Sequence, residues 1–283
     1  MRFVFSLVLA TFAAVARGEM SNSVPAEFPF QLREGLLWVE VNTPESAKPL
    51  NFLLDTGAEV SVINLSTAKR LGFSLAPKVK VRGVHASMTG YWPQKLSATT
   101  SGVALPADFL AVDLSKLSRS CEKPLDGLIG ADFFRGKVVQ IDFAAQKVRL
   151  LTVEETSSAE SALPLDLRHC GMRVQASVNG SEPQWLRVDT GCATSLHWVT
   201  RNVRPKECSS KVAIGLAKLN IPQKSMSVNL GEHTFQDVPT GLHRTAIFPG
   251  EAGLLGNGLL SRFSRVTIDA KAGRLILEGN PAQ

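Results

Sequence analysis

Phe52-Leu53-Leu54-Asp55-Thr56-Gly57-Ala58 joins an apolar strand to an Asp-Thr-Gly turn, and a second apolar strand follows over residues 60–63. The arrangement returns as Trp185-Leu186-Arg187-Val188-Asp189-Thr190-Gly191-Cys192. A carboxylate at the end of a buried strand costs free energy unless its charge is compensated, and glycine permits the tight turn after it. Two such costly turns in one chain predict that the two carboxylates meet.

Each turn is followed by the same two landmarks. Gly127-Leu128-Ile129-Gly130 ends 75 residues after Asp55, and Gly253-Leu254-Leu255-Gly256 ends 67 residues after Asp189. Both lead through a short helical segment into a pair of closing strands, residues 139–143 with 147–151 and 266–270 with 274–277. One Asp-Thr-Gly alone could be an Asx turn at a strand end. Three ordered landmarks found twice predict an internal duplication with a period of roughly 130 residues.

These motifs resemble those of the pepsin and retropepsin superfamily of aspartic proteases, in the form that carries both lobes in one chain. The resemblance implies an all-β fold of two homologous β-barrel lobes with the active-site cleft between them. It also implies that Asp55 and Asp189 form a dyad that activates a water to hydrolyse peptide bonds, without a metal, cofactor or covalent intermediate. The supporting residues would be Thr56, Gly57, Thr190 and Gly191, which tie the two turns together and permit them.

The two lobes are expected over residues 19–155, with Asp55 and a flap, and residues 156–283, with Asp189. The segment 152–162 is rich in Ser, Glu and Thr and lacks apolar periodicity, which is typical of a linker. Residues 79–96 predict the flap hairpin, and the resemblance makes Gly90 and Tyr91 candidates for substrate binding. Packing within the hairpin is an equally good interpretation of Tyr91. The second lobe has no clear flap signal.

Residues 1–18 are typical of a secretory signal peptide, with Arg2 before an apolar run over residues 3–16 and cleavage after Ala16 or Gly18. The run is shorter than the roughly 20 residues that span a bilayer, so we expect no stable membrane insertion after cleavage, an uncleaved anchor being the alternative. The protein is expected to be secreted or periplasmic. Roughly a dozen residues, 19–30, separate this segment from the first strand pattern, so we expect no pro-segment and direct synthesis of the active form.

The charges argue against other classes of partner. The 283 residues include 31 Lys and Arg against 25 Asp and Glu, a net charge of +6. The basic residues are scattered rather than clustered between aromatic residues, so no nucleic-acid partner is expected.

The five histidines form no metal-ligand spacing, so no metal is expected. We expect a monomer acting on a peptide or protein substrate.

Cysteine usage leaves alternatives open. Cys121, Cys170, Cys192 and Cys208 allow three full disulfide pairings, and the sequence does not choose among them. Cys192 follows the Asp189 turn directly, so a catalytic thiol is one interpretation. No histidine is placed by a motif to act as its base, and a small packing residue is the favoured interpretation.

Two positions depart from the pepsin pattern. Pepsin-like enzymes carry a hydroxyl residue directly after each Asp-Thr-Gly, whereas this chain has Ala58, as retropepsins do, and Cys192. Fewer donors to an ionised carboxylate raise its pKa, which predicts activity at weakly acidic to near-neutral pH. A non-catalytic or inhibitor-type relative whose cleft binds protein or glycan partners is the main alternative. An unrelated secreted β-protein with accidental Asp-Thr-Gly turns is another.

Overall fold

The computed structural model describes residues 26–83, 86–93, 95–152, 155, 162–168, 171–200, 209–214 and 217–279. Short strands dominate this part of the chain. Its helices are α1 (Leu65–Arg70), α2 (Ser115–Ser118), the 3-10 helix η1 (Ala131–Phe134) and α3 (Asn257–Leu260). The predicted all-β fold class is confirmed. No helix in the described ranges has the length and apolar character needed to cross a bilayer.

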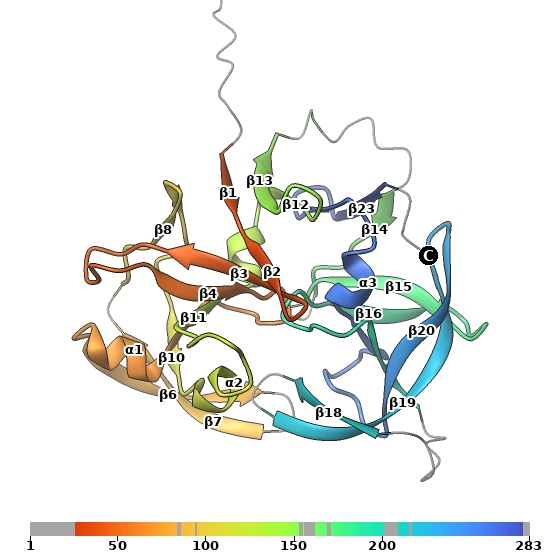
Figure 1. Ribbon diagram of the computed structural model, residues 1–283, viewed down its shortest axis with the longest axis horizontal. Coiled ribbons are helices and arrows are strands. Elements are labelled where there is room, and N and C mark those ends of the chain that lie inside the picture. The colour runs from red at the N-terminus through yellow and green to blue at the C-terminus, as the bar shows by residue number, and fades with distance from the viewer. Residues whose placement is uncertain are drawn as a thin grey trace, which may run out of the picture.

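One sheet of eight strands forms the first lobe, seen at the left of Figure 1. Its strands are β2 (Gln31–Arg33), β3 (Leu36–Val41), β4 (Leu50–Leu54), β5 (Val62–Asn64), β6 (Leu75–Gly83), β7 (Ala86–Pro93), β10 (Leu110–Val112) and β11 (Gly127–Ile129). They are hydrogen-bonded in the order β2-β3-β4-β11-β5-β10-β7-β6. The short pair β8 (Thr99–Thr100) and β9 (Val103–Ala104) adds a separate two-stranded sheet. The apolar strand before Asp55 thus lies in the middle of the sheet.

A sheet of seven strands forms the second lobe, at the right of Figure 1. Its strands are β15 (Arg173–Val178), β16 (Gln184–Val188), β17 (Leu196–Val199), β18 (Ser209–Ile214), β19 (Ala217–Leu230), β20 (His233–His243) and β21 (Gly253–Leu255). Their order is β15-β16-β21-β17-β20-β19-β18, and an additional pairing of β15 with β19 makes the sheet barrel-like. The strand before Asp189 occupies the place that β4 has in the first lobe, next to a parallel β21.

A third sheet joins the two halves, above both lobes in Figure 1. It consists of β1 (Glu27–Pro29), β12 (Val138–Asp142), β13 (Lys147–Leu151), β14 (Ala162–Pro164), β22 (Arg265–Asp269) and β23 (Arg274–Glu278). β12 and β22 pair antiparallel at its centre, with Val139 opposite Ile268. The closing strands predicted for each half therefore form one continuous sheet.

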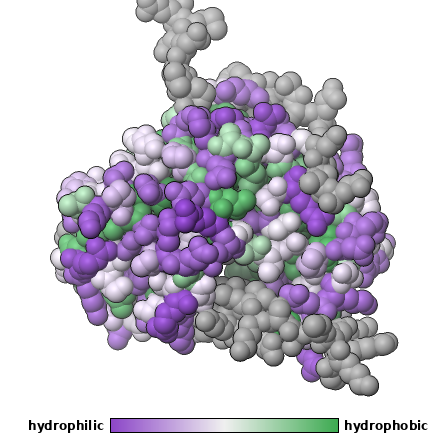
Figure 2. Space-filling view, viewed as in Figure 1, coloured by the Kyte–Doolittle hydropathy of each residue, from purple (hydrophilic) through white to green (hydrophobic). Residues whose placement is uncertain are grey.

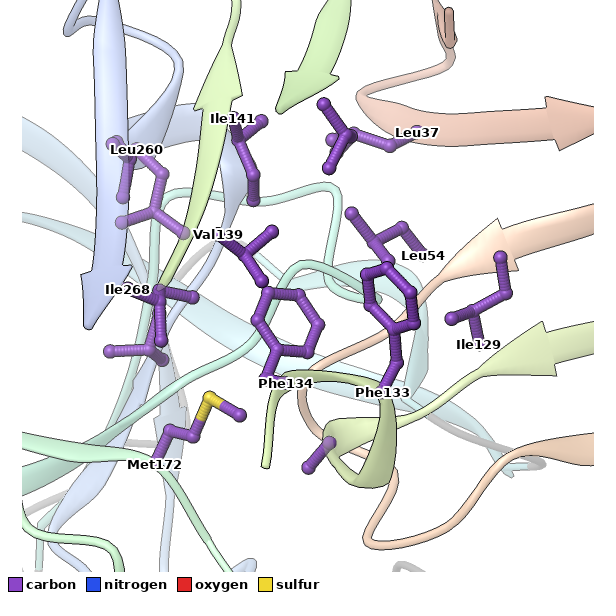
Figure 3. Packing of buried hydrophobic residues seen from close by; sticks show 14 of the residues in the cluster. Leu37, Leu54, Ile129, Phe133, Phe134, Val139, Ile141, Met172, Leu260 and Ile268 are labelled. Carbon is purple, nitrogen blue, oxygen red and sulfur yellow. The ribbon is translucent and has the colours of Figure 1, made fainter. Parts of the chain in front are cut away.

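One apolar cluster contains buried side chains from all three large sheets, and Figure 3 shows part of it. Phe133 and Phe134 of η1 are fully buried and meet edge to face, with ring centroids 5.5 Å apart. Each contributes about 2–3 kcal/mol through burial. Around them lie first-half residues such as Leu54 and second-half residues such as Ile268. Because one core includes side chains from both halves, the halves support each other.

Large hydrophobic side chains of the described residues are rarely exposed. Leu167, at 40% exposure, is the one large hydrophobic side chain that is exposed within the described ranges. The face drawn in Figure 2 is mostly hydrophilic, with hydrophobic residues concentrated near its centre. Apolar side chains of the described residues are thus largely taken up by the interior.

The hairpin predicted over residues 79–96 exists as β6 paired antiparallel with β7. The second lobe also has a hairpin, in which β18 pairs with β19 from Ser209 opposite Pro222 to Ile214 opposite Ala217. No flap signal was clear in the sequence of the second lobe, although this hairpin is present there. The cause is that the strands of this hairpin carry charged and polar residues in place of clear alternation.

Other expectations concern residues that the structure does not describe. The signal peptide at residues 1–18 lies outside the described residues, as does most of the linker segment 152–162. The lobe boundary at residue 155 and the boundary at residue 19 stay predictions. Cys170 and Cys208 also lie outside, while Cys121 and Cys192 are free thiols.

Candidate active site

Asp55 directly follows β4, where β11 holds the strand end in place. β11 runs parallel to β4 and antiparallel to β5, so it threads between the two strands that flank the turn. The Asp55 amide donates to the Ile129 carbonyl at 2.9 Å. The amides of Gly57 and Ala58 both donate to Oδ1 of Asp55, at 3.0 and 3.1 Å. The turn thus folds back on the carboxylate that it carries.

Asp189 is held in the same way in the second lobe. β21 lies parallel to β16 and antiparallel to β17, and the Asp189 amide donates to the Leu255 carbonyl at 2.9 Å. The Gly191 amide donates to Oδ1 of Asp189 at 2.9 Å. The two apolar segments that end in glycine are therefore the supports of the two turns.

Four hydrogen bonds connect the two turns through their threonines. The Thr56 amide donates to Oγ1 of Thr190 and the Thr190 amide donates to Oγ1 of Thr56, both at 3.0 Å. The Thr56 hydroxyl also donates to the Val188 carbonyl at 2.7 Å, and the Thr190 hydroxyl donates to the Leu54 carbonyl at 2.8 Å. Both threonines are almost completely buried. The structure thus brings the two turns into direct, reciprocal contact.

The glycines of the turns face the carboxylate of the other lobe. A Cβ atom on Gly57 would lie 2.5 Å from Oδ1 of Asp189, and a Cβ atom on Gly191 would come closer than 3.0 Å to Asp55. Real Cβ atoms essentially never approach a heavy atom so closely. Glycine is therefore required at both positions because of this close approach.

The carboxyl groups of Asp55 and Asp189 lie close enough for each to shift the pKa of the other. Burial raises the pKa of Asp55, although the Ala58 and Gly57 amides oppose the rise. Burial and then the negative charge of Asp55 hold the pKa of Asp189 well above its ordinary value. Two adjacent carboxyls resist double ionisation, so the pair retains one proton into a less acidic range than isolated carboxyls do.

Arg187 is a charged neighbour that sequence reasoning missed. It lies in β16, two residues before Asp189, and is 5% exposed. Its Nη2 and Nε donate to Glu251 at 2.7 and 2.9 Å, and its Nη1 donates to the Gly57 carbonyl at 3.3 Å. The signal in the sequence was an arginine inside an otherwise apolar strand.

Asn257 is a second support that sequence reasoning missed. Its side chain is 1% exposed, and its Nδ2 donates to the carbonyls of Gly35 and Thr190 at 2.8 and 2.7 Å. It therefore links α3 of the second lobe both to the first lobe and to the Asp189 turn. No sequence motif pointed to it, since Gly35 is 222 residues away.

A buried hydrogen-bonded chain leads away from the Asp189 turn. Cys192 Sγ and Thr194 Oγ1 are 3.1 Å apart, Thr194 Oγ1 and His197 Nε2 are 2.7 Å apart, and His197 Nδ1 and His243 Nε2 are 2.9 Å apart. Burial, followed by the charge of Asp189, raises the pKa of Cys192 to about 12. The thiol is thus neutral, and Thr194 separates it from His197. This arrangement favours the packing interpretation of Cys192 over a catalytic thiol.

Gly90 and Tyr91 lie within β7, not at the tip of the hairpin. Gly90 pairs with Val79 on one side and Val112 on the other, while Tyr91 pairs with Lys78 and Ala111. The half-buried Tyr91 side chain packs against the main apolar cluster. Substrate contact by these two residues stays a prediction.

The described ranges were also compared with the ligand sets of metal sites. The described residues contain no group of three or more His, Cys, Asp or Glu side chains that could hold a metal ion.

Comparisons with known proteins point to the same motif. Residues 39–133 match the family described as aspartyl protease. Over 94 residues the chain is 31% identical to a retrovirus-related Pol polyprotein from transposon 412 of Drosophila melanogaster. That match covers 33% of this chain and 7% of the polyprotein, so the chain spans a small part of that relative's length. The resemblance to aspartic proteases of the pepsin and retropepsin type is confirmed, and the part of the chain that matches the family is the one that carries Asp55.

Proposed function

We propose that this protein is an aspartic endopeptidase in which Asp55 and Asp189 act together. The single observation that supports the proposal is the reciprocal Thr56–Thr190 contact, which joins the two Asp-Thr-Gly turns that carry the carboxyls. A pair that holds one proton offers an acid and a base at the same place. The aspartyl protease match over residues 39–133 supports the same chemistry.

The chemistry requires one water and no other reactant. The ionised carboxyl takes a proton from a water, whose oxygen bonds to the carbonyl carbon of the peptide while the protonated carboxyl donates to the carbonyl oxygen. The tetrahedral intermediate then collapses: the C–N bond breaks, the nitrogen receives a proton from the dyad, and a carboxylic acid and an amine leave. The proton belongs to the pair, because coupled groups titrate together.

Both hairpins support a peptide or protein as the substrate. β6–β7 and β18–β19 reach out from the two lobes, and both lie along the lower edge of the view in Figure 1. Strand edges bind extended peptides through backbone hydrogen bonds, and mobile hairpins can exclude water from a reaction. A nucleic-acid partner is not part of the proposal, and the protein is proposed to act as a monomer.

We also propose that the protein is exported and that its two lobes arose by internal duplication. Residues 1–18 support secretion or a periplasmic location, without stable membrane insertion after signal cleavage. The shared strand pairing around Asp55 and Asp189 supports an internal duplication. Fractionation with N-terminal mass determination checks the location, and a mature protein that begins well inside the first lobe would contradict synthesis without a pro-segment.

A non-catalytic binding or inhibitor-type protein is the second candidate, and one observation favours it. Among the described hydrogen bonds, the Asp55 side chain accepts two from backbone amides, whereas the Asp189 side chain accepts one. The residue after the second Asp-Thr-Gly turn is Cys192 rather than a hydroxyl residue. A dyad with fewer donors is less well prepared to hold its negative charge.

The test is hydrolysis of a peptide library by the purified protein from about pH 3 to about pH 8, a range that covers both limbs of a dyad profile. Asp55→Asn and Asp189→Asn are each expected to abolish cleavage, and a statine-type inhibitor is expected to block it. Asp108→Asn is the matched control, since Asp108 is exposed on the first lobe. If the folded protein cleaves nothing, or if either dyad variant still cleaves, the endopeptidase proposal is wrong.

A further inference from the structure

A guanidinium group occupies a place beside the dyad where the first lobe has a leucine. Arg187 stands two residues before Asp189 and pairs with Leu254 of β21, as Leu53 stands two residues before Asp55 and pairs with Leu128 of β11. Leu53 is an ordinary core residue at 2% exposure. Burying a charge costs free energy that a leucine in the same place would not require. We therefore looked for a role of the Arg187 charge near the dyad that offsets this cost.

The surroundings of Arg187 hold its guanidinium rigidly. Glu251, itself buried, accepts two hydrogen bonds from it, and the Phe248 ring lies 3.7 Å from the guanidinium carbon. A Cβ atom on Gly171 would lie 2.6 Å from Nη2, so a larger residue there would displace the guanidinium from this position. A two-point contact with a carboxylate fixes the orientation of an arginine in a way that a lysine cannot reproduce.

The remaining arm of Arg187 reaches the other lobe. Its Nη1 donates to the carbonyl of Gly57, the glycine of the first Asp-Thr-Gly turn, at 3.3 Å. The positive charge of Arg187 also lowers the pKa of Asp55 and of Asp189, against the rise that burial causes. Arg187 thus contacts the first turn, lies in the strand that leads to the second turn, and lowers the pKa of both carboxyls.

We infer that Arg187 is a positioning residue of the dyad: held by Glu251, it anchors the Asp55 turn to the second lobe and stabilises the single negative charge that the two carboxyls share. This inference rests on the proposed endopeptidase function. It extends that function by naming the residue pair that sets the pH range in which the dyad holds one proton.

The charged groups that face Arg187 lead to opposite pH predictions for substitutions at Arg187 and at Glu251. They are Glu251 before β21, Arg173 directly opposite on β15, and the two carboxyls of the dyad. Arg187→Met removes a positive charge, so both limbs of the pH profile of kcat/KM move to higher pH. Glu251→Gln leaves the positive charge uncompensated, so both limbs move to lower pH. Each shift is expected to be up to about one pH unit, which is about tenfold in kcat/KM at a fixed pH on the acidic limb.

Arg173 offers a matched control in the same sheet. It is equally buried at 5% exposure, forms an ion pair with Asp166 at 2.7 Å, and lies over the Trp185 ring. Arg173→Met therefore removes a buried, paired arginine one strand away from Arg187. It is expected to lower the melting temperature, and because its charge is paired with Asp166, to move the pH profile less than Arg187→Met does.

The experiment compares pH profiles and melting temperatures of the full chain for the wild type, Arg187→Met, Glu251→Gln, Arg187→Lys and Arg173→Met. The double variant Arg187→Met/Glu251→Gln removes both charges, so it tests the effect without leaving a buried carboxylate unpaired. It is expected to fold and to keep a profile between those of the two single variants. Arg187→Lys keeps the charge, so its limbs are expected to stay near the wild-type positions while kcat falls.

The result that overturns the inference is a loss of melting temperature in Arg187→Met and Arg173→Met alike, with every pH profile unmoved. If the wild type shows no cleavage that depends on Asp55 and Asp189, the proposed function fails instead. The inference is then still decided by carbon-13 NMR titration of the two carboxyls. A dyad that titrates at the same pH in the wild type, in Arg187→Met and in Glu251→Gln contradicts it.

Discussion

Replacing Thr56 by valine keeps the shape of a fully buried side chain between the two Asp-Thr-Gly turns but removes its hydroxyl group. The hydroxyl accepts from the Thr190 amide at 3.0 Å and donates to the Val188 carbonyl at 2.7 Å. Losing one hydrogen bond costs about 1 kcal/mol, and a buried partner left without one costs about 1–3 kcal/mol. With two partners affected, Thr56→Val is expected to lower the free energy of unfolding by about 2–4 kcal/mol.

The substitution is also expected to lower kcat. The threonine contact sets the separation of the carboxyls, and misplacing reacting groups by about 1 Å costs about 100-fold in rate. Urea unfolding, followed by tryptophan fluorescence, measures the stability, and hydrolysis of a peptide measures kcat. Thr56→Ser keeps both hydrogen bonds and is expected to recover most of each loss.

Thr240→Val is the matched control for this prediction. Thr240 is also fully buried, but its hydroxyl donates to the Val238 carbonyl within its own strand, at 2.9 Å. It should cost about 1 kcal/mol and leave kcat unchanged. If Thr56→Val costs no more than Thr240→Val, or if Thr56→Ser is as damaging as Thr56→Val, the threonines do not hold the two turns together.

Two further predictions concern pH. Ala58→Ser adds a hydroxyl donor beside Asp55, whose Oδ1 already accepts from the Ala58 amide. It should lower the pKa of the pair and move the acidic limb of the kcat/KM profile to lower pH. An unmoved limb would show that a donor at this position is without effect. Burial and the neighbouring His243 lower the pKa of His197 to about 3. Below about pH 6.5 this histidine is protonated in the unfolded chain, whereas in the folded protein it stays neutral down to about pH 3. The free energy of unfolding therefore falls as the pH drops through this window, by at most about 1.4 kcal/mol per pH unit from this group. Urea unfolding at several pH values should show a smaller slope in His197→Gln, and equal slopes would rule out His197 as the source.

Much of the site could be predicted because its signals are local. The strand before Asp55, the turn glycine and the supporting segment that ends at Gly130 each follow from short patterns of apolar residues and glycine. Their repetition around Asp189 made the pairing of the two turns predictable as well. The second hairpin was missed because β18 and β19 lack clear alternation, and pairing with a neighbouring strand can override weak local preference.

By itself, the sequence determined the all-β class, the two Asp-Thr-Gly turns and the expectation that their carboxyls meet. Only the tertiary structure decided which groups surround them. Glu251 is 64 residues from Arg187, His243 is 46 residues from His197, and Gly35 is 222 residues from Asn257. Such partners come together when sheets close and lobes pack, and no local pattern records which buried faces will meet. The physical reason is that strand and turn formation depends on neighbours in the chain, whereas the charge and hydrogen bonding of a buried site depend on neighbours in space.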